Sequence, residues 1–307
     1  MTTPPSDRRV TVALMVAATA LFASTSLLAK AVGSGALGPA LHPLMVSAGR
    51  FVFAFIAVAT VVAAIRPRLT RPDWRTHITR TICGWVGISL MFAAVAQMPL
   101  PDATAISFLS PVFTMLLAIP LLGERVGPVR WSAAGIALLG AVILLRPAGD
   151  IQMAAFFALG AAVAMGTESI FIKRLAVREQ PLQVLFINNG IGAVIASVAV
   201  MAVLSRATPA QWGALMAIGG LIACGQALNL LAMRRDDASF VVPFFYLTLI
   251  WAALFDLWWF EVLPDGISLI GAAVIIAGAL LLVLRDRRRG GAGVMPSTQR
   301  GDQGFRR

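Results

Sequence analysis

The sequence predicts an all-α membrane protein, and the prediction rests on its composition, the length of its apolar blocks and the placement of its positive charges. Of the 307 residues, 59% are hydrophobic and only 13% are charged. A soluble domain has about 25% charged and about 45–50% apolar residues. The apolar residues also recur in blocks along the whole chain, so an ordinary soluble protein is excluded, although the length would suffice for two soluble domains.

Ten membrane-spanning helices fit between the polar N-terminal segment 1–9 and the tail 285–307. About 275 residues lie between these ends, and a helix that crosses a bilayer takes about 20 residues plus a short connection. A transmembrane barrel would need segments of about ten residues with alternating polar and apolar side chains, and the blocks do not alternate. The expected spans are 10–31, 43–65, 78–98, 103–122, 129–146, 152–172, 182–204, 212–233, 238–260 and 266–284.

The first apolar block also resembles a secretory signal peptide. Arg8 and Arg9 precede it, and Ala29, Lys30 and Ala31 form a small-x-small cleavage pattern. The apolar core of a signal peptide runs for about 7–15 residues, whereas this block runs for about 20. Its length favours a membrane span.

The positive charges predict the orientation of the spans. With the N-terminus inside, 21 of the 25 Lys and Arg residues lie on the inner side, including five between Arg66 and Arg80. Lys30, Arg146 and Arg206 lie outside, and Arg50 lies within a span. Membrane proteins carry such an excess in their cytoplasmic loops. We therefore expect a multi-pass protein of a bacterial-type inner membrane with both termini in the cytoplasm.

The net charge of +11 follows from this inner-side bias. In a soluble chain it would indicate a nucleic-acid partner, which we do not expect here. The basic tail 285–307 is predicted to be disordered and to lie against the anionic inner leaflet of the lipid bilayer.

The chain contains an internal repeat with offsets of 135, 137 and 138 residues, about half of the membrane domain. Each half, 10–146 and 147–284, then holds five spans. Because five is an odd number, the second half enters the membrane from the opposite side. Inverted repeats occur in transporters, which bind substrate near the midplane between the halves. The matching positions are Asp102-Ala103 and Asp237-Ala238, Glu124 and Glu261, and Gly140 and Gly278.

The repeat and the segment LLGERVGPVRWSAAG at 121–135 resemble the EamA type of the drug/metabolite transporter superfamily. The resemblance covers about residues 10–285 and implies a transporter of five plus five helices. It leaves the substrate open, because these motifs mostly concern architecture. In the second half, the residue before Glu261 is Phe260, whereas the family pattern usually has a glycine at this position. Further motifs are similar to the branch that holds riboflavin and S-adenosylmethionine carriers: Lys30, Arg50-Phe51, Met98-Pro99-Leu100 with Ala103-Thr104-Ala105-Ile106, Ser110-Pro111, Gly123-Glu124-Arg125 and Arg146-Pro147.

Arg50 is the arginine that the predicted topology does not explain. It lies seven residues into the second span, which is about 10 Å below the outer surface at 1.5 Å per residue. A guanidinium stays charged and costs several kcal/mol at this depth unless it faces a cavity or a partner. It either contacts an anionic or hydrogen-bond-accepting group of a substrate, or forms a structural ion pair or extends to the headgroups.

Two further charges lie near the outer surface. Lys30 ends the first span, and Asp256 lies about four residues inside the outer end of the ninth span, beside Trp258 and Trp259. Interfacial roles are the alternative for both. We expect Arg50, Lys30 and Asp256 to converge in an outer vestibule, where two positive charges and one negative charge favour anionic or zwitterionic substrates.

Three glutamates lie near span ends. Glu168, close to the inner end of the sixth span, either pairs with Lys173 and Arg174 or couples protons to transport, as buried carboxylates do in pumps and transporters. Glu124 and Glu261 are equivalent by the repeat, and we expect both to have structural roles.

Two prolines interrupt predicted spans. Pro111 and Pro243 each remove the hydrogen bond to the carbonyl four residues back, which belongs to Ser107 and Ser239 respectively. Broken helices at a repeat interface indicate a binding site, although a simple kink has the same pattern. Other candidate pathway side chains, with packing between helices as the alternative, are Asn188, Asn189, Gln226, Asn229 and Tyr246.

These features favour a secondary transporter of a small organic metabolite that works by alternating access. Flavins, nucleoside-like compounds, amino acids and exported drugs all fit. We expect no enzyme, metal or cofactor, since only His42 and His77 are present, Cys83 and Cys224 lie in apolar blocks, and catalytic motifs are missing. The alternatives are a non-transporting membrane scaffold or sensor, which would lack a soluble output domain, and an intramembrane enzyme without a recognisable acid–base set.

Overall fold

The computed structural model describes residues 8–67, 69–110, 112–114, 116–117, 128–145, 153–176, 179–235, 244–245 and 247–290. These residues contain helices and no strand, which confirms the all-α class. The helices are α1 (Arg8–Gly33), α2 (Pro43–Ile65), α3 (Trp74–Val95), α4 (Leu100–Ser107), α6 (Pro128–Leu145), α7 (Met153–Ala176), α8 (Pro181–Val200), α9 (Pro209–Arg235), α11 (Leu247–Phe260) and α12 (Gly266–Gly290).

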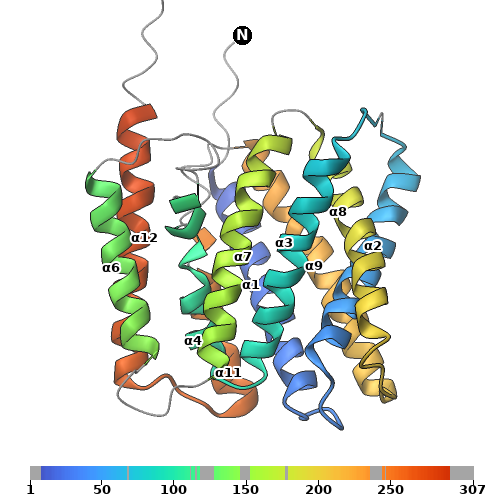
Figure 1. The fold of residues 1–307 in the computed structure, drawn as a ribbon, viewed down its shortest axis with the longest axis horizontal. Helices are drawn as coiled ribbons and strands as arrows, with labels where there is room; N and C mark the ends of the chain where they lie inside the picture. Colours follow the sequence, from blue (N-terminus) through green and yellow to red (C-terminus); the bar gives the residue numbers. More distant parts are fainter. Residues whose placement is uncertain are drawn as a thin grey trace, which may run out of the picture.

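Six of these helices are long and apolar enough to cross a membrane: α1, α2, α3, α7, α8 and α9. Shorter apolar stretches lie at Leu247–Phe260 and Gly266–Gly278. The helices stand side by side in one bundle (Figure 1). The architecture is that of a multi-pass membrane protein. The count of ten spans stays a prediction, since parts of the fourth and ninth expected spans lie outside the described residues.

Helix α2 begins and ends where the sequence predicts. Pro43 is its first residue, a position that suits proline because the missing N–H has no helical partner there. The imidazole Nδ1 of His42 accepts a hydrogen bond from the Leu44 amide at 3.2 Å. At the other end, Arg66 adopts a left-handed conformation with φ 49°, and its N–H donates to the Val62 carbonyl. This C-terminal cap ends the helix.

Helix α3 begins four residues earlier than the expected start at residue 78. Asp73 caps the helix, because its carboxylate accepts hydrogen bonds from the Thr76 amide at 3.3 Å and the Thr76 hydroxyl at 2.8 Å. The added turn places Arg80 well inside the helix, where it is buried. Arg80, which the sequence counted among the inner-side charges at the start of the span 78–98, therefore belongs to the interior of the bundle.

The principal contacts between the two halves come in pairs. In each pair, one contact becomes the other when every helix is replaced by its equivalent in the other half. If α1, α2, α3, α4 and α6 are taken as equivalents of α7, α8, α9, α11 and α12, the contact of α3 with α7 corresponds to that of α9 with α1. The contacts of α4 with α7 and of α11 with α1 correspond in the same way, as do those of α2 with α9 and of α8 with α3. Equivalent helices also pack on each other in α2–α8 and α6–α12.

The α6–α12 pair stands at one edge of the bundle (Figure 1). A Cβ atom added to Gly140 of α6 would lie 2.7 Å from the Ile275 backbone nitrogen and 2.8 Å from the Gly271 carbonyl oxygen of α12. Only glycine permits this backbone approach. Helix α12 continues to Gly290, whereas the sequence ended the last span at residue 284.

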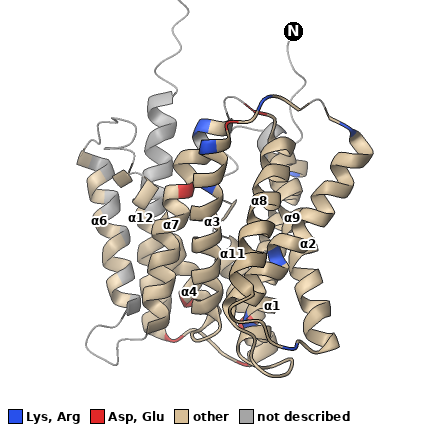
Figure 2. Ribbon diagram, turned by 45° about the vertical axis from the view of Figure 1, so that its right-hand side comes forward, with Lys and Arg blue, Asp and Glu red and all other residues tan. Residues whose placement is uncertain are grey.

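Lys and Arg residues gather mainly at one end of the bundle (Figure 2). This is the end at which α1 begins and α12 finishes (Figure 1). Positive charge is thus concentrated on one side of the apolar helices, in the described part of the chain.

Candidate functional site

A cavity of about 750 Å³ lies between helices of both halves. Helices α1, α2, α3 and α4 contribute lining residues from the first half, and α7, α8, α9 and α11 contribute them from the second. Small-molecule sites have volumes of about 300–1,000 Å³, with mostly apolar walls and a few polar groups. The cavity fits this description, because four charged residues and several amides interrupt a wall of aromatic and aliphatic side chains. We call it the central cavity.

Arg50 is a charged residue with unused hydrogen-bonding capacity in the central cavity. The residue is 6% exposed, and its guanidinium carbon lies 4.3 Å from the centroid of the Phe51 ring. Its buried Nη1 has no hydrogen-bond partner among the described residues. Glu168 attracts the charge of Arg50, and Arg80 repels it.

Arg80, Glu168 and Glu179 are the other charged residues of the lining. The Nε atom of Arg80 lies 3.4 Å from Oε1 of Glu168, and its Nη1 donates to the Val184 carbonyl at 3.5 Å. Pairing of Glu168 with Lys173 and Arg174 was the alternative favoured by the sequence. The ion pair that the structure shows joins Glu168 of α7 to Arg80 of α3, and the pairing with Lys173 and Arg174 stays a prediction.

Gly84 makes room for the Glu168 carboxylate. A Cβ atom at Gly84 would lie 2.8 Å from each of the two carboxylate oxygens. Because Gly84 is one turn beyond Arg80 on α3, the same helix supplies both the positive partner and the space for the negative one. This arrangement is not apparent from the spacing of the residues, because it depends on how α3 packs against α7.

Amide side chains form a second polar group in the central cavity. Asn188 of α8 accepts a hydrogen bond from the Thr81 hydroxyl at 3.1 Å. The buried oxygens Oε1 of Gln226 and Oδ1 of Asn229, both on α9, have no partner in the part of the chain that the structure describes. Buried polar atoms are normally hydrogen-bonded, so these two oxygens are available to accept from a ligand.

Ser107 also lines the central cavity, where its hydroxyl donates to the Thr104 carbonyl at 2.7 Å. Glu261 follows α11 in a left-handed conformation with φ 56°, and its side chain is exposed. Five other predicted residues lie outside the described residues: Pro111, Glu124, Ser239, Pro243 and Tyr246.

Lys30 and Asp256 pair with each other outside the lining of the central cavity. Asp256 is fully buried, and its Oδ2 also accepts a hydrogen bond from the Leu100 amide at 2.9 Å. The Lys30 ammonium lies 4.4 Å from the centroid of the Phe260 ring. The three charges that were expected to converge therefore lie in two places. Lys30 and Asp256 form one ion pair, and Arg50 lies in the central cavity with Arg80 and Glu168.

Sequence reasoning missed a buried polar network around Glu179. The Glu179 carboxylate accepts hydrogen bonds from the Asp73 amide at 3.0 Å and from Gln183 Nε2 at 2.7 Å, and its Oε2 lies 2.8 Å from Nε2 of His77. Burial alone would raise the pKa of Glu179, but these hydrogen bonds hold it below its ordinary value of 4.5. The network ties the start of α3 to the connection between α7 and α8.

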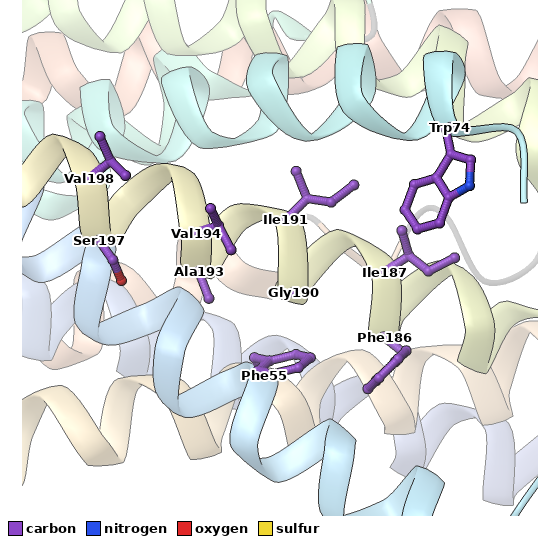
Figure 3. A pocket seen from close by; sticks show the side chains of 10 residues that line it. All are labelled: Phe55, Trp74, Phe186, Ile187, Gly190, Ile191, Ala193, Val194, Ser197 and Val198. Atoms are coloured by element: carbon purple, nitrogen blue, oxygen red, sulfur yellow. The ribbon is translucent and has the colours of Figure 1, made fainter.

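A second hollow, of about 640 Å³, lies on an apolar face of the bundle. Figure 3 shows Phe55 of α2 and Trp74 of α3 on either side of α8, whose side chains here are nearly all hydrocarbon. Val194 and Val198 are each 66% exposed, as expected for a surface that faces lipid tails. The lining of this groove contains no charged residue.

A comparison with protein families matches nearly the whole membrane domain. Residues 9–146 and 152–284 each match the EamA-like transporter family. The two matched segments correspond to the two halves whose helices form the central cavity.

Three characterised relatives cover most of this chain. A riboflavin transporter of Rhizobium johnstonii is 34% identical over 233 residues, which are 74% of this chain and 75% of the relative. An S-adenosylmethionine uptake transporter of Rickettsia bellii is 28% identical and covers 82% of this chain and 87% of its own length. A pseudopaline exporter of Pseudomonas aeruginosa is 25% identical, with corresponding shares of 76% and 86%.

A solved crystal structure has the same fold. It covers 90% of this chain and 98% of its own chain, with a TM-score of 0.60 and 21% sequence identity. At this identity the likeness establishes the fold alone. The family match and the named relatives are those of transporters and not of enzymes, and the chain belongs to the EamA-like transporter family.

Proposed function

We propose that the chain is a secondary transporter of a small organic metabolite, with anionic or zwitterionic compounds favoured, and that it works by alternating access. The central cavity is the observation that carries this proposal. Both halves supply polar side chains to it, and both halves supply its apolar walls. Relative motion of the halves would therefore change access to the substrate without dismantling either half.

The helix contacts support this mechanism. Paired contacts between the halves are what two inverted repeats, 10–146 and 147–284, would make if each contained five spans. In this proposal both termini face the cytoplasm of a bacterial inner membrane, in agreement with the end at which Lys and Arg gather (Figure 2). The organisms of the relatives are bacteria, which agrees with this localisation.

The substrate class follows from charge and shape. The central cavity is lined by Arg50, Arg80, Glu168 and Glu179. The Glu179 carboxylate is already engaged by the Asp73 amide, His77 and Gln183, which leaves Arg50, Arg80 and Glu168 with one excess positive charge. Phe22 and Phe245, stacked with ring centroids 6.2 Å apart, belong to its wall and suit a flat ring system. The relatives are named for riboflavin, S-adenosylmethionine and pseudopaline, and compounds of these kinds are the first candidates. Asn188, Gln226 and Ser107 are the proposed hydrogen-bonding contacts.

Glu168 is the proposed proton-coupling group. It is a carboxylate within the membrane domain, and the charged or titratable groups near it are Arg80, Arg50 and Cys83. Carboxylates in such positions carry protons in transporters. Lys30 and Asp256 are proposed to border the outer part of the substrate route.

Reconstitution tests the proposal. Purified protein in liposomes would be loaded with each member of a panel of flavins, nucleoside-like compounds, amino acids and carboxylated chelators, and counterflow of the labelled compound would be measured. We expect counterflow for a subset of the panel and none in protein-free liposomes. A scaffold or sensor would give no counterflow with any compound. An imposed proton gradient is expected to accelerate uptake by the wild type and not by Glu168→Gln.

A further inference from the structure

We propose that Arg50 and Arg80 form an oxyanion site that holds a carboxylate or phosphate group of the substrate, and that Glu168 is a built-in counter-ion which this group displaces from Arg80. The inference rests on the transport function proposed above and deepens it. It assigns the charged part of the substrate to one end of the central cavity.

Arg50 supplies the free half of the oxyanion site. It is more than nine-tenths buried and lines the central cavity, yet its Nη1 has no hydrogen-bond partner among the described residues. A buried charge is costly unless it is paired. A guanidinium presents its N–H donors in a planar fork that matches the two oxygens of a carboxylate or phosphate, so an oxyanion is the ligand that would satisfy it.

Arg80 supplies the second half of the oxyanion site. The Glu168 carboxylate occupies this half when no substrate is bound. Its Nε is 3.4 Å from Glu168 Oε1, whereas a charge-assisted hydrogen bond has a length of about 2.7–2.9 Å. The pair is therefore in electrostatic contact without a short hydrogen bond. A substrate oxyanion with better geometry can replace the carboxylate at Arg80 at a modest cost.

Charge balance explains why both arginines take part. Glu179, the fourth charged residue of the lining, is engaged by the Asp73 amide, His77 and Gln183. The other three, Arg50, Arg80 and Glu168, together carry one excess positive charge in an interior where unpaired charge is expensive. One substrate oxyanion neutralises that excess. After the substrate leaves, Glu168 again pairs with Arg80, which limits the unpaired charge of the empty transporter to Arg50.

The remaining polar atoms place the rest of the substrate. The unpaired oxygens of Gln226 and Asn229 accept hydrogen bonds, so they select N–H or O–H donors on the same molecule. An oxyanion at the arginines and a donor at α9 together describe a compound that carries both an acidic group and an amine or amide.

Simple anions test the site without knowledge of the substrate. Purified wild type, Arg50→Gln and Glu168→Gln would be titrated with sodium acetate or sodium phosphate at constant ionic strength, with chloride as the balancing anion, and thermal unfolding would be recorded. Removing Glu168 leaves the arginines without their carboxylate, so we expect the half-saturating oxyanion concentration to fall about tenfold in Glu168→Gln and to rise about tenfold in Arg50→Gln. Whichever of acetate and phosphate stabilises more strongly identifies the preferred oxyanion.

Two matched variants complete the test. Arg75→Gln removes an exposed arginine from the same helix as Arg80 and should leave the titration unchanged. Arg50→Lys keeps the charge but loses the planar fork, and should fall between wild type and Arg50→Gln. Equal responses of wild type, Arg50→Gln and Glu168→Gln would overturn the oxyanion site, as would a stabilisation that chloride reproduces.

The outcome is separable from that of the transport proposal. Oxyanion binding that changes as predicted, with no counterflow across the panel in liposomes, would support the site and reject transport. Counterflow that survives while Arg50→Gln and Glu168→Gln leave the oxyanion titration unchanged would support transport and reject the site.

Discussion

Lys30 of α1 and Asp256 of α11 form a buried ion pair between residues that lie 226 positions apart in the chain. The Asp256 carboxylate also receives the Leu100 amide of α4. One carboxylate thus holds together three helices that come from both halves of the molecule. The pair lies outside the lining of the central cavity, so its first effect is on the packing of the halves.

Asp256→Asn should destabilise the protein strongly. The substitution leaves a buried ammonium without its carboxylate, which costs about 3–5 kcal/mol when one partner of a buried pair is removed. The double variant Lys30→Met with Asp256→Asn removes both charges and should recover part of the loss. Thermal unfolding of the purified protein measures both, with Arg206→Gln as a control at an exposed arginine. Equal stability of Asp256→Asn and wild type would contradict the pair.

Gly84→Ala should impair transport more than stability. The added methyl group would meet the Glu168 carboxylate, with 2.8 Å between the new Cβ and each oxygen. A side-chain end can shift aside, so we expect a stability change below about 1 kcal/mol and loss of the Arg80–Glu168 contact. Gly213→Ala, on a part of α9 with open space around the glycine, is the matched control. Wild-type transport in Gly84→Ala would show that the position of Glu168 does not matter.

Gly140→Ala should separate α6 from α12. The new Cβ would lie 2.7 Å from the Ile275 backbone nitrogen, and a backbone cannot move aside as a side chain can. Gly135→Ala lies on the same helix with nothing within 4 Å, and alanine there should stabilise α6 by about 0.5–1 kcal/mol. Opposite shifts in the melting temperatures of these two variants are the expected result. A Gly140→Ala variant as stable as Gly135→Ala would be inconsistent with this packing.

The Glu179 network should weaken in acid. Hydrogen bonds to the carboxylate hold the pKa of Glu179 below its ordinary value of 4.5. A carboxyl whose pKa is lower in the folded state contributes its full stabilisation above the ordinary value, and this contribution disappears as the pH falls through the folded-state pKa. The melting temperature of the wild type should therefore exceed that of Glu179→Gln at neutral pH, and the difference should shrink below about pH 4.5. A constant difference from pH 7 to pH 4 would contradict the assignment.

The apolar blocks were sufficient to predict most helices, because membrane spans are set by length and hydrophobicity. Helix α2 has the predicted ends at Pro43 and Ile65. Helix α3 differs because its start depends on a cap from Asp73, a polar signal that a count of apolar residues does not register. That added turn places Arg80 well inside the helix instead of near its predicted start.

The candidate site was predictable only in part. Arg50 stood out because a charge within a span needs an explanation, and the structure places it in the central cavity. Its neighbours did not stand out, since the contact between Arg80 and Glu168 spans 88 positions of sequence and depends on the packing of α3 against α7. The unpaired Asn229 oxygen and the Glu179 network likewise become visible only when side chains are placed together.

Counterflow in liposomes that contain wild type, Arg50→Gln or Arg75→Gln tests the central claim most directly. If the cavity between the halves is the substrate site, the wild type and Arg75→Gln should exchange the same labelled metabolite at similar rates. Arg50→Gln should exchange it at least about tenfold more slowly, because it loses a charge-assisted contact in the site. Absence of counterflow across the whole panel, or undiminished exchange by Arg50→Gln, would contradict this claim.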